Sequence, residues 1–356
     1  PEAIFRYLFD HPDFKHLRHV WAIKDPQAIR RFKAEFRDHP RVRFVPRDGS
    51  SYWRALSTSR VLFNNATFPP AFGKRESQLY VNTWHGTPLK RMGFDIPDGA
   101  VESANTLRNF LMADYLLAAN DTMREQMYEG AYRLCNIYRG RIIEEGYPRI
   151  DRQMLTEPQR TRLREELREA GITVGELPLV LYAPTWRGTS FTDPEADAEE
   201  LLRRTAALQA GLGSDFRVLL RPHQAVQAVL EASPTLARDL VPSTIPTNVL
   251  LGAAAGLVTD YSSVLFDFLA TGRPIGFLTP DADEYTRSRG TYAPIDELPG
   301  PISADAHTVG GELRALLHTK TAHPRYAEWA ARFAPFEDGR ATERIVDIVL
   351  RGRVEE

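Results

Sequence analysis

Apolar residues recur along the first part of the chain at two alternating spacings. Stretches with the three-to-four-residue spacing of an amphipathic helix alternate with short apolar runs that are typical of buried strands. The spacing predicts helices at residues 2–11, 26–39, 52–59, 102–113 (begun by a cap near Ser103) and 121–135. The apolar runs predict strands at residues 18–23, 41–46, 60–65, 78–85 and 114–120. Strands that alternate with helices indicate a parallel sheet covered on both faces.

A second alternation follows a charged helix at residues 157–172, which buries little and leads out of the first domain. Its predicted strands are 177–187, 216–223, 256–262 and 274–281, its predicted helices are 224–232, 248–254 and 263–272, and the tail from about Asp305 is mostly helical. We therefore expect an α/β protein of two Rossmann-like, doubly wound domains that face a central cleft. The expected domains are residues 1–150 and 151–335, with a C-terminal helix in 336–356 that packs back on the first domain. Because the chain opens directly on a helix, we expect that a strand is missing upstream.

Composition narrows the class of protein. A length of 356 residues favours two domains, and 43% hydrophobic and 26% charged residues are ordinary for a globular protein. The net charge of -2 gives no global nucleic-acid signature. The single cysteine, Cys135, excludes an intrachain disulfide and fits a reducing compartment. No apolar run reaches the length of a membrane span, and no signal peptide is visible.

Four polar clusters lie at the carboxyl ends of predicted strands. They are "WHGTPLK" in the first domain and "YAPTWRG", "LRPHQ" and "TDYSSVLFD" in the second. In open parallel sheets, ligands bind just outside those strand ends. The division of the clusters between the two domains indicates one shared cleft.

The last of these clusters, "TDYSSVLFD", resembles a phosphate-binding site. The strand that ends at Thr259 runs into Asp260, Tyr261, Ser262 and Ser263, and a predicted helix follows at once. The first turn of that helix offers free N–H groups, two hydroxyl groups and the positive end of the helix dipole. The alternative is that Asp260 or Ser262 only caps the helix.

The other clusters of the second domain supply cations and a histidine. Arg221 and His223 follow one apolar strand, where arginine can bind phosphate oxygens in a fork and histidine can neutralise a leaving phosphate. Thr185 and Arg187 follow another strand. A core histidine and a surface arginine after a turn are the structural alternatives.

In the first domain, His85 is a candidate general base for an acceptor hydroxyl group. Gly86 lets the backbone approach a ligand closely, and Thr87, Lys90 and Arg91 are candidates to hold an anion. The alternative is a structural histidine below a turn.

Several common motifs are absent from the sequence. It contains no Walker A loop, no G-x-G-x-x-G after a strand, no H-E-x-x-H, no paired cysteines and no G-x-S-x-G. Asp281 and Asp283 form a D-x-D after a strand, which we interpret as a solvated acidic loop because no other cluster supplies a partner carboxylate. We therefore expect no metal site and no cofactor.

Taken in order, these motifs resemble the CDP-glycerol glycerophosphotransferases, the primases and polymerases of teichoic acid synthesis and their capsule-polymer relatives. "NTWHGTPLKRMGFD", "LYAPTWRG", "RPH", "TDYSSVLFDFLATGRPI" and "DADEYTRSRGTYAPIDELPGP" carry the resemblance, which covers about residues 3–339. It implies a glycosyltransferase-B-like fold without a catalytic metal ion, CDP-glycerol as donor and CMP as leaving group. The first domain would then face the acceptor and the second would bind the nucleotide donor. "RGTY" at residues 289–292 departs from the commoner Arg-Gly-Phe-Tyr.

The resemblance also implies roles for single residues. His85 matches the base, His223 matches the histidine at the donor pyrophosphate, and Asp260, Ser262 and Ser263 match the phosphate segment, with Asp267 further along the same motif. Lys90 and Arg91 would hold the anionic acceptor. Arg187 and Arg221 match positions that vary more within the family.

Alternative functions remain open at this point. CDP-ribitol is a rival donor, a nucleotide-sugar glycosyltransferase would share the fold, and a polyanion-binding module without catalysis is a third possibility. We expect a cytoplasmic protein with a lipid-linked anionic acceptor and no nucleic-acid partner. The cationic stretch at residues 30–47 would permit peripheral contact with the inner face of the membrane, or is a solvated helix face.

Overall fold

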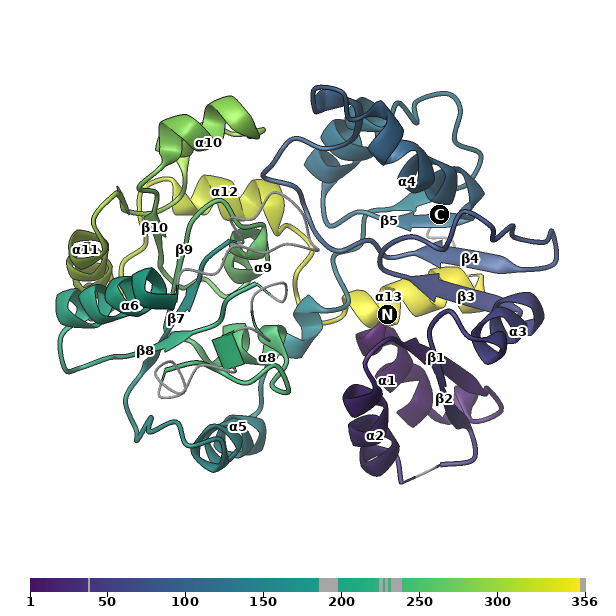
Figure 1. The fold of residues 1–356 in the computed structure, drawn as a ribbon, viewed down its shortest axis with the longest axis horizontal. Coiled ribbons are helices and arrows are strands. Elements are labelled where there is room, and N and C mark those ends of the chain that lie inside the picture. The colour runs from purple at the N-terminus through teal and green to yellow at the C-terminus, as the bar shows by residue number, and fades with distance from the viewer. Residues whose placement is uncertain (38, 186–197, 224–226, 228–229, 232–238, 353–356) are drawn as a thin grey trace.

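The chain forms two α/β halves that lie side by side (Figure 1). The computed structural model describes residues 1–352 except 38, 186–197, 224–226, 228–229 and 232–238. One half holds strands β1 to β6, and the other holds β7 to β11; we call them the first and the second half.

The first half alternates helices and strands from its start. Its elements are α1 (Glu2–Asp10), η1 (Pro12–Phe14), β1 (His19–Ile23), α2 (Pro26–Glu35), β2 (Val42–Pro46), α3 (Ser50–Thr58), β3 (Val61–Asn64), β4 (Leu79–Asn82), η2 (Gly93–Asp95), α4 (Ala100–Met112), β5 (Tyr115–Leu117), η3 (Met123–Ala131), β6 (Arg141–Ile143) and η4 (Ile150–Gln153). Of these, η3 is wound with the wider hydrogen-bond spacing of a π-helix.

The second half also alternates helices and strands, and it ends in helices. Its elements are α5 (Glu157–Glu169), β7 (Leu179–Ala183), α6 (Ala198–Leu212), β8 (Arg217–Leu220), α8 (Thr247–Ala253), β9 (Gly256–Thr259), α9 (Val264–Leu269), β10 (Ile275–Leu278), α10 (Ala282–Ser288), η5 (Ile295–Glu297), β11 (Ile302–Ser303), α11 (Ala306–Thr319) and α12 (Tyr326–Phe333). Two last elements, α13 (Ala341–Val346) and η6 (Asp347–Arg351), return to the first half.

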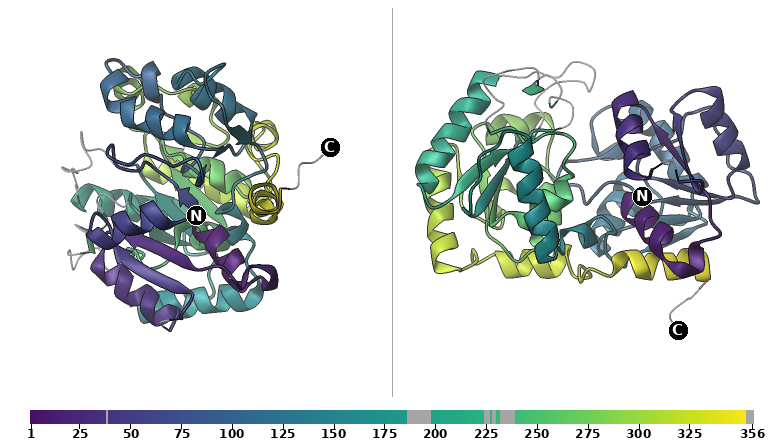
Figure 2. Two further views of the ribbon diagram at one scale, coloured as in Figure 1. Left: turned by 90° about the vertical axis from the view of Figure 1, so that its right-hand side faces the viewer. Right: turned by 90° about the horizontal axis from the view of Figure 1, so that it is seen from below.

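The main sheet of the first half is parallel, in the order β3-β4-β5-β6, and β1 and β2 form a separate parallel pair. Successive residues of a strand point to opposite faces, so Tyr80 and Leu116 belong to the core under α4 and η3. Val81 and Leu117 point the other way, into a core shared with α1, α13 and η6. The C-terminal segment therefore completes the first half, and Figure 2 shows it running along one edge of the molecule from the second half.

The sheet of the second half is also parallel, in the order β11-β10-β9-β7-β8. The direction in which successive strands are added reverses between β7 and β9. In open α/β sheets a reversal of this kind leaves a crevice outside the carboxyl ends of the two strands, where ligands bind. Side chains on alternate sides, such as Val180 and Leu181, enter two separate cores, so helices cover both faces of this sheet.

The predicted α/β class with parallel sheets is confirmed. The helix at 102–113 was placed too late: α4 begins at Ala100, because Ser103 N already donates to the carbonyl of Gly99 at 2.9 Å as part of the helix. The predicted acidic loop at Asp281 is wrong, since α10 begins directly after it. Helix α6 had no counterpart in the prediction. The helix predicted at 224–232 falls largely outside the described residues.

Candidate active site

The loop that carries His85 begins where β4 ends. The predicted strand ran to His85, but β4 stops at Asn82, whose side-chain oxygen accepts a hydrogen bond from Trp84 N at 2.8 Å. Trp84 (φ 48°) and Gly86 (φ 131°) both have positive φ angles, which are costly for a tryptophan. His85 is thus displayed on a sharp, strained turn at the carboxyl end of a buried strand.

The ring of His85 is exposed, but its orientation and tautomer are fixed. Nδ1 lies 2.9 Å from the carbonyl oxygen of Asn65, and the ring stacks on Trp84 with centroids 4.1 Å apart. A carbonyl oxygen can only accept, so Nδ1 carries the proton and Nε2 keeps its lone pair. Partial loss of water around the ring lowers the pKa of His85; the bond to Asn65 opposes this shift, and Arg149 adds to it. The imidazole is therefore neutral near pH 7, with Nε2 as its basic atom.

Arg149 holds the backbone of this loop, and sequence reasoning missed it. Its Nη1 donates to the carbonyl oxygen of His85 at 2.5 Å, and its Nη2 donates to Asp267 Oδ1 at 2.7 Å. A Cβ on Gly86 would lie 2.6 Å from Arg149 Nη2, so the glycine makes room for the guanidinium and not for a ligand. Asp267, predicted to bind substrate, is buried and ties the second half to the His85 loop.

Hydrogen bonds made by Thr87 and Tyr147 also hold the loop that carries His85. Tyr147 OH donates to the carbonyl of Thr83 and accepts from Gly86 N at 3.2 Å. Thr87 is buried, and its hydroxyl oxygen accepts from Asn120 Nδ2 at 3.1 Å. The structure thus gives Thr87 a place in the scaffold, although the sequence analysis proposed it as an anion ligand.

The residues after Thr87 cross to the second half. Leu89 is buried in the hydrophobic core of that half. Lys90 pairs with Thr291 as an antiparallel bridge, and Arg91 N donates to the carbonyl of Gly290 at 3.2 Å. The "RGTY" segment that departs from the family pattern is therefore the partner of this loop. Its Tyr292 also accepts a bond from Met92 N at 3.1 Å.

The switch point of the second sheet is bridged by Asp260. Its two carboxylate oxygens accept from Thr185 N at 2.9 and 3.1 Å, which joins the ends of β9 and β7. Thr259 is buried and donates to the carbonyl of Ala183 at 2.7 Å. Tyr261 is buried too: it donates to Asp281 Oδ1 at 2.9 Å and stacks on Tyr285 at 3.8 Å. These residues shape the crevice.

Ser262 and Ser263 are the partly exposed residues of this segment. They directly precede α9, a helix of six residues, and Ser262 Oγ accepts from Val264 N at 3.4 Å. Leu265 N and Phe266 N donate to the carbonyl oxygens of Ser262 and Ser263, so the first turn does not offer the free N–H groups expected from the sequence, and the two hydroxyl groups are what this segment presents to a ligand.

Arg221 and His223 follow β8, and their surroundings differ. The guanidinium of Arg221 donates to the carbonyl oxygens of Val241 and Pro242 at 3.3 and 2.7 Å, and burial lowers its pKa against the opposing effect of Glu231. His223 is half-buried; burial lowers its pKa first, and the charge of Lys90 lowers it further. The charge of a lysine in the first half therefore acts on a histidine of the second half. Arg187 falls outside the described residues.

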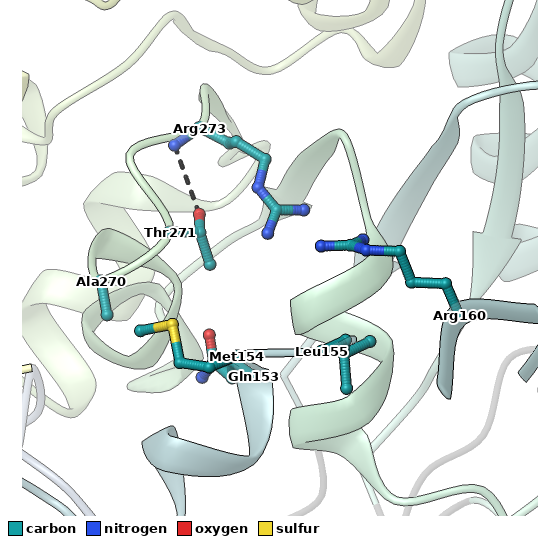
Figure 3. Close-up of a pocket in the computed structure, with 7 residues that line it drawn as sticks. All are labelled: Gln153, Met154, Leu155, Arg160, Ala270, Thr271 and Arg273. Carbon is teal, nitrogen blue, oxygen red and sulfur yellow. Dashed lines mark hydrogen bonds between the residues drawn. The ribbon is translucent and has the colours of Figure 1, made fainter. Parts of the chain in front are cut away.

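A recess in the structure lies apart from the predicted site residues. It has a volume of about 360 Å³ and is lined by Gln153, Met154, Leu155, Arg160, Ala270, Thr271 and Arg273 (Figure 3).

In the part of the chain that the structure describes, the D-x-D motif does not form a metal site with other acidic residues. Its Asp281 accepts a hydrogen bond from the hydroxyl group of Tyr261. Among the described residues, no three histidine, cysteine or acidic side chains form a group that could hold a metal ion. In the same part of the chain, no helix has the length and apolarity of a membrane span.

Comparison with protein families gives one match. The model of the family described as CDP-Glycerol:Poly(glycerophosphate) glycerophosphotransferase matches residues 1–351. The match spans both halves, the cleft motifs and the returning C-terminal helix.

Two curated relatives differ in length. The teichoic acid poly(glycerol phosphate) polymerase of Staphylococcus epidermidis is 29% identical over 362 residues, which cover 98% of this chain and 48% of the relative. The teichoic acid glycerol-phosphate transferase of Staphylococcus aureus is 28% identical over 370 residues, 99% of this chain and 89% of the relative. The chain thus spans about half the length of the first relative and most of the second.

Solved structures support the same kinship. A variant of the wall teichoic acid polymerase TagF soaked with CDPG superposes with a TM-score of 0.79 at 26% identity, covering 99% of this chain and 85% of that chain. A UDP-N-acetylglucosamine 2-epimerase superposes with a TM-score of 0.57 at 14% identity, covering 99% and 93% of the two chains, which speaks for the fold alone.

Proposed function

The chain belongs to the CDP-glycerol:poly(glycerophosphate) glycerophosphotransferase family, and we propose that it transfers glycerol phosphate from CDP-glycerol to a hydroxyl group of an anionic, lipid-linked acceptor. CMP is the second product. The reaction serves the synthesis of teichoic acid or a capsule polymer. Glycerophosphate transfer in teichoic acid synthesis is the activity named for its relatives.

The transfer begins at the acceptor. His85 Nε2 takes the proton of the acceptor hydroxyl as that oxygen attacks the glycerol-bearing phosphorus of the donor. The bond between this phosphorus and the bridging oxygen breaks, and the electron pair leaves with CMP. His85 suits this role because its Nδ1 donates to Asn65, which leaves Nε2 free as the basic atom. This single observation carries the chemical part of the proposal.

The second half receives the negative charge that develops on the leaving group. His223 and Ser262 stabilise the phosphates of the departing CMP. Asp260 and Thr259 keep the ends of β7 and β9 in place, and Arg221 secures the chain after β8. These residues organise the crevice without touching the reacting atoms.

The ion pair between Arg149 and Asp267 aligns the two halves for this reaction. Arg149 binds the carbonyl of His85 and the carboxylate of Asp267, so it relates the base to the helix that follows the phosphate segment. Asn248 Nδ2 holds the other oxygen of Asp267 at 3.2 Å. An acceptor oxygen must approach within about 3–3.5 Å of phosphorus for efficient reaction, so this alignment contributes to the rate.

The acceptor side suggests where the enzyme works. Four exposed cations lie on or next to α2: Arg30, Arg31, Lys33 and Arg37. The intervening Glu35 forms a salt bridge of 2.7 Å with Arg6, which neutralises its charge. A cationic face of this kind attracts anionic lipid. We place the protein at the inner, cytoplasmic face of the membrane, where a lipid-linked acceptor is available. Sedimentation with anionic vesicles should then give binding that salt weakens; no pelleting at low salt would contradict this placement.

The decisive experiment compares donors. CDP-glycerol, CDP-ribitol, UDP-N-acetylglucosamine and GDP-mannose are each offered with an anionic glycerol-phosphate acceptor, and the released nucleotide is identified. We expect CMP from CDP-glycerol. Release of CMP only from CDP-ribitol would identify a ribitol-phosphate transferase, and release of UDP or GDP would identify a glycosyltransferase. Binding of the acceptor with no nucleotide released from any donor would reject an enzymatic role.

A further inference from the structure

Lys90 belongs to the first half in sequence but is built into the second half. Leu89, directly before it, is only 2% exposed and packs in the hydrophobic core of the second half. Leu89 O accepts from Tyr292 N at 2.8 Å, and Lys90 itself pairs with Thr291. These contacts fix the backbone on both sides of Lys90 against the second half.

The ammonium group of Lys90 lies among residues of the donor motifs. Nζ is 5.5 Å from the ring centroid of Tyr285, within reach of a cation–π contact. Tyr285 stacks on Tyr261, which belongs to the segment that ends in Ser262 and Ser263. The same ammonium charge acts on His223, which follows β8 on the far side of β7. Lys90 therefore lies near both donor motifs, those that follow β8 and β9.

We propose that Lys90 reaches across the cleft and binds the diphosphate of the donor, together with His223 and Ser262. The inference rests on the proposed function and changes the expectation from sequence, in which Lys90 held the acceptor. Lysine is a compact point charge suited to phosphate oxygens, and the ring of Tyr285 holds its long side chain beside the crevice.

This arrangement couples donor binding to the base. Lys90 and His85 lie on one short loop whose backbone is held by Arg149 and by Thr291, so a donor that binds Lys90 is positioned relative to the base. The donor site is then incomplete in the second half alone.

The test measures donor affinity without acceptor. Calorimetry with CDP-glycerol compares the wild type with Lys90→Met, Lys90→Arg and Lys15→Met; the last is the matched control, because Lys15 is an exposed lysine of the first half. We expect Lys90→Met to weaken binding roughly 10- to 100-fold, the usual effect of losing a charged hydrogen-bond donor. Lys90→Arg should retain most of the affinity and Lys15→Met all of it, while the KM for acceptor stays unchanged in Lys90→Met.

A pH series separates direct electrostatic contact from a structural effect. Among the described residues, Lys90 is the charged group that acts on His223, and it lowers the pKa of that imidazole. Removing the charge in Lys90→Met should move the His223-dependent midpoint of CDP-glycerol binding to higher pH. The shift should vanish when His223→Ala is added. CDP-glycerol suits this series because its diphosphate diester has no group that titrates near neutrality.

Two outcomes would overturn the proposal, and a third would overturn the proposed function instead. Unchanged donor affinity in Lys90→Met with a raised KM for acceptor would return Lys90 to the acceptor side. An unchanged pH midpoint would show that Lys90 acts only on the fold. If the wild type bound no CDP-glycerol, the proposed function would fail, and the same variants titrated with inorganic pyrophosphate would still decide whether Lys90 binds a diphosphate. Should Lys90→Met not fold, Lys90→Gln replaces it, because glutamine keeps a polar tip without the charge.

Discussion

At the scale of single residues, the candidate site depends on how each side chain is held. His85 is exposed, but the carbonyl of Asn65, the ring of Trp84 and the guanidinium of Arg149 restrict its ring and backbone. His223 is half-buried beside a cation of the opposite half. The two histidines therefore have different surroundings, and the proposed function assigns one to the acceptor and the other to the leaving group.

Alanine at the two histidines should have different effects. His85→Ala should lower turnover roughly 10²–10⁴-fold, the usual range for loss of a general base, and leave CDP-glycerol affinity nearly unchanged. His223→Ala should lower turnover and also weaken donor or CMP binding. Steady-state kinetics and calorimetry on each variant check this pair. Normal turnover of a folded His85→Ala variant would remove the loop from the mechanism.

Chelation provides a second test at this scale. The positive charge in the proposed site comes from side chains, and Asp281 accepts the hydroxyl of Tyr261. Activity should therefore survive EDTA. A strict need for Mg²⁺ that spermidine cannot replace would contradict the proposed site, and Asp281→Asn and Asp283→Asn would be the next variants to assay.

Sequence patterns predicted the residues at strand ends better than the residues that hold them. His85, His223 and Ser262 follow apolar strands, so their positions could be predicted from the pattern. Arg149 and Tyr147 could not, because they occur in an ordinary turn some sixty positions after His85 and meet it only through the fold. Burial of Thr87 and Asp267 could not be predicted either, because a polar residue in a motif gives no local sign that it packs within the scaffold.

At the scale of elements, the carboxyl end of α8 shows how arginines secure a short helix. The last carbonyl groups of a helix have no partner within it. Arg273 donates to the carbonyls of Gly252 and Ala254, and Arg160 donates to Gly252 O at 3.1 Å. Figure 3 shows both guanidinium groups pointing toward this helix end above the recess. The helix lies next to η4, which leads from the first half.

Removal of Arg273 should destabilise the protein without direct loss of a site residue. Arg273→Met leaves carbonyl oxygens of α8 without their charged donor, so we expect the free energy of unfolding to fall by about 1–3 kcal/mol. Urea denaturation measures the change. Arg287→Met, at an exposed arginine of α10, is the matched control and should stay within about 0.5 kcal/mol of the wild type. Equal stability of both variants would refute the capping role.

At the scale of the whole molecule, the two halves are joined at several separate places. The Leu89–Met92 loop lies on residues 290–292, Arg149 pairs with Asp267, and Glu337 accepts from Tyr147 N at 3.0 Å. Alternating patterns predicted two parallel sheets. They could not predict the strand order or these contacts, because pairing across halves depends on shape and not on local periodicity.

The junction at Glu337 should make stability depend on pH. Burial raises the pKa of Glu337 from 4.5 to about 8; the bond from Tyr147 N opposes this shift, and the charge of Asp267 adds to it. The folded state thus favours the protonated carboxyl group, whereas the unfolded chain ionises above pH 4.5. The free energy of unfolding should therefore fall as pH rises from about 4.5 to about 8.

Glu337→Gln tests this dependence, because glutamine keeps an oxygen for Tyr147 N but cannot ionise. Thermal unfolding should give nearly equal midpoints for variant and wild type near pH 4.5. The variant should gain steadily up to about pH 8, after which the difference stays constant. Two parallel curves across this range would mean that Glu337 is already ionised in the folded protein.

The helix that closes the first half is synthesised only after the whole second half. Until α13 and η6 emerge, the face of the sheet that carries Val81 and Leu117 is covered only in part, by N-terminal residues such as Ile4 and Leu8. The first half therefore cannot finish folding as it is synthesised, although N-terminal domains usually fold first. The uncovered part of this apolar face has to be shielded while the whole second half is translated, so the growing chain should depend on chaperones for longer than its division into two halves suggests.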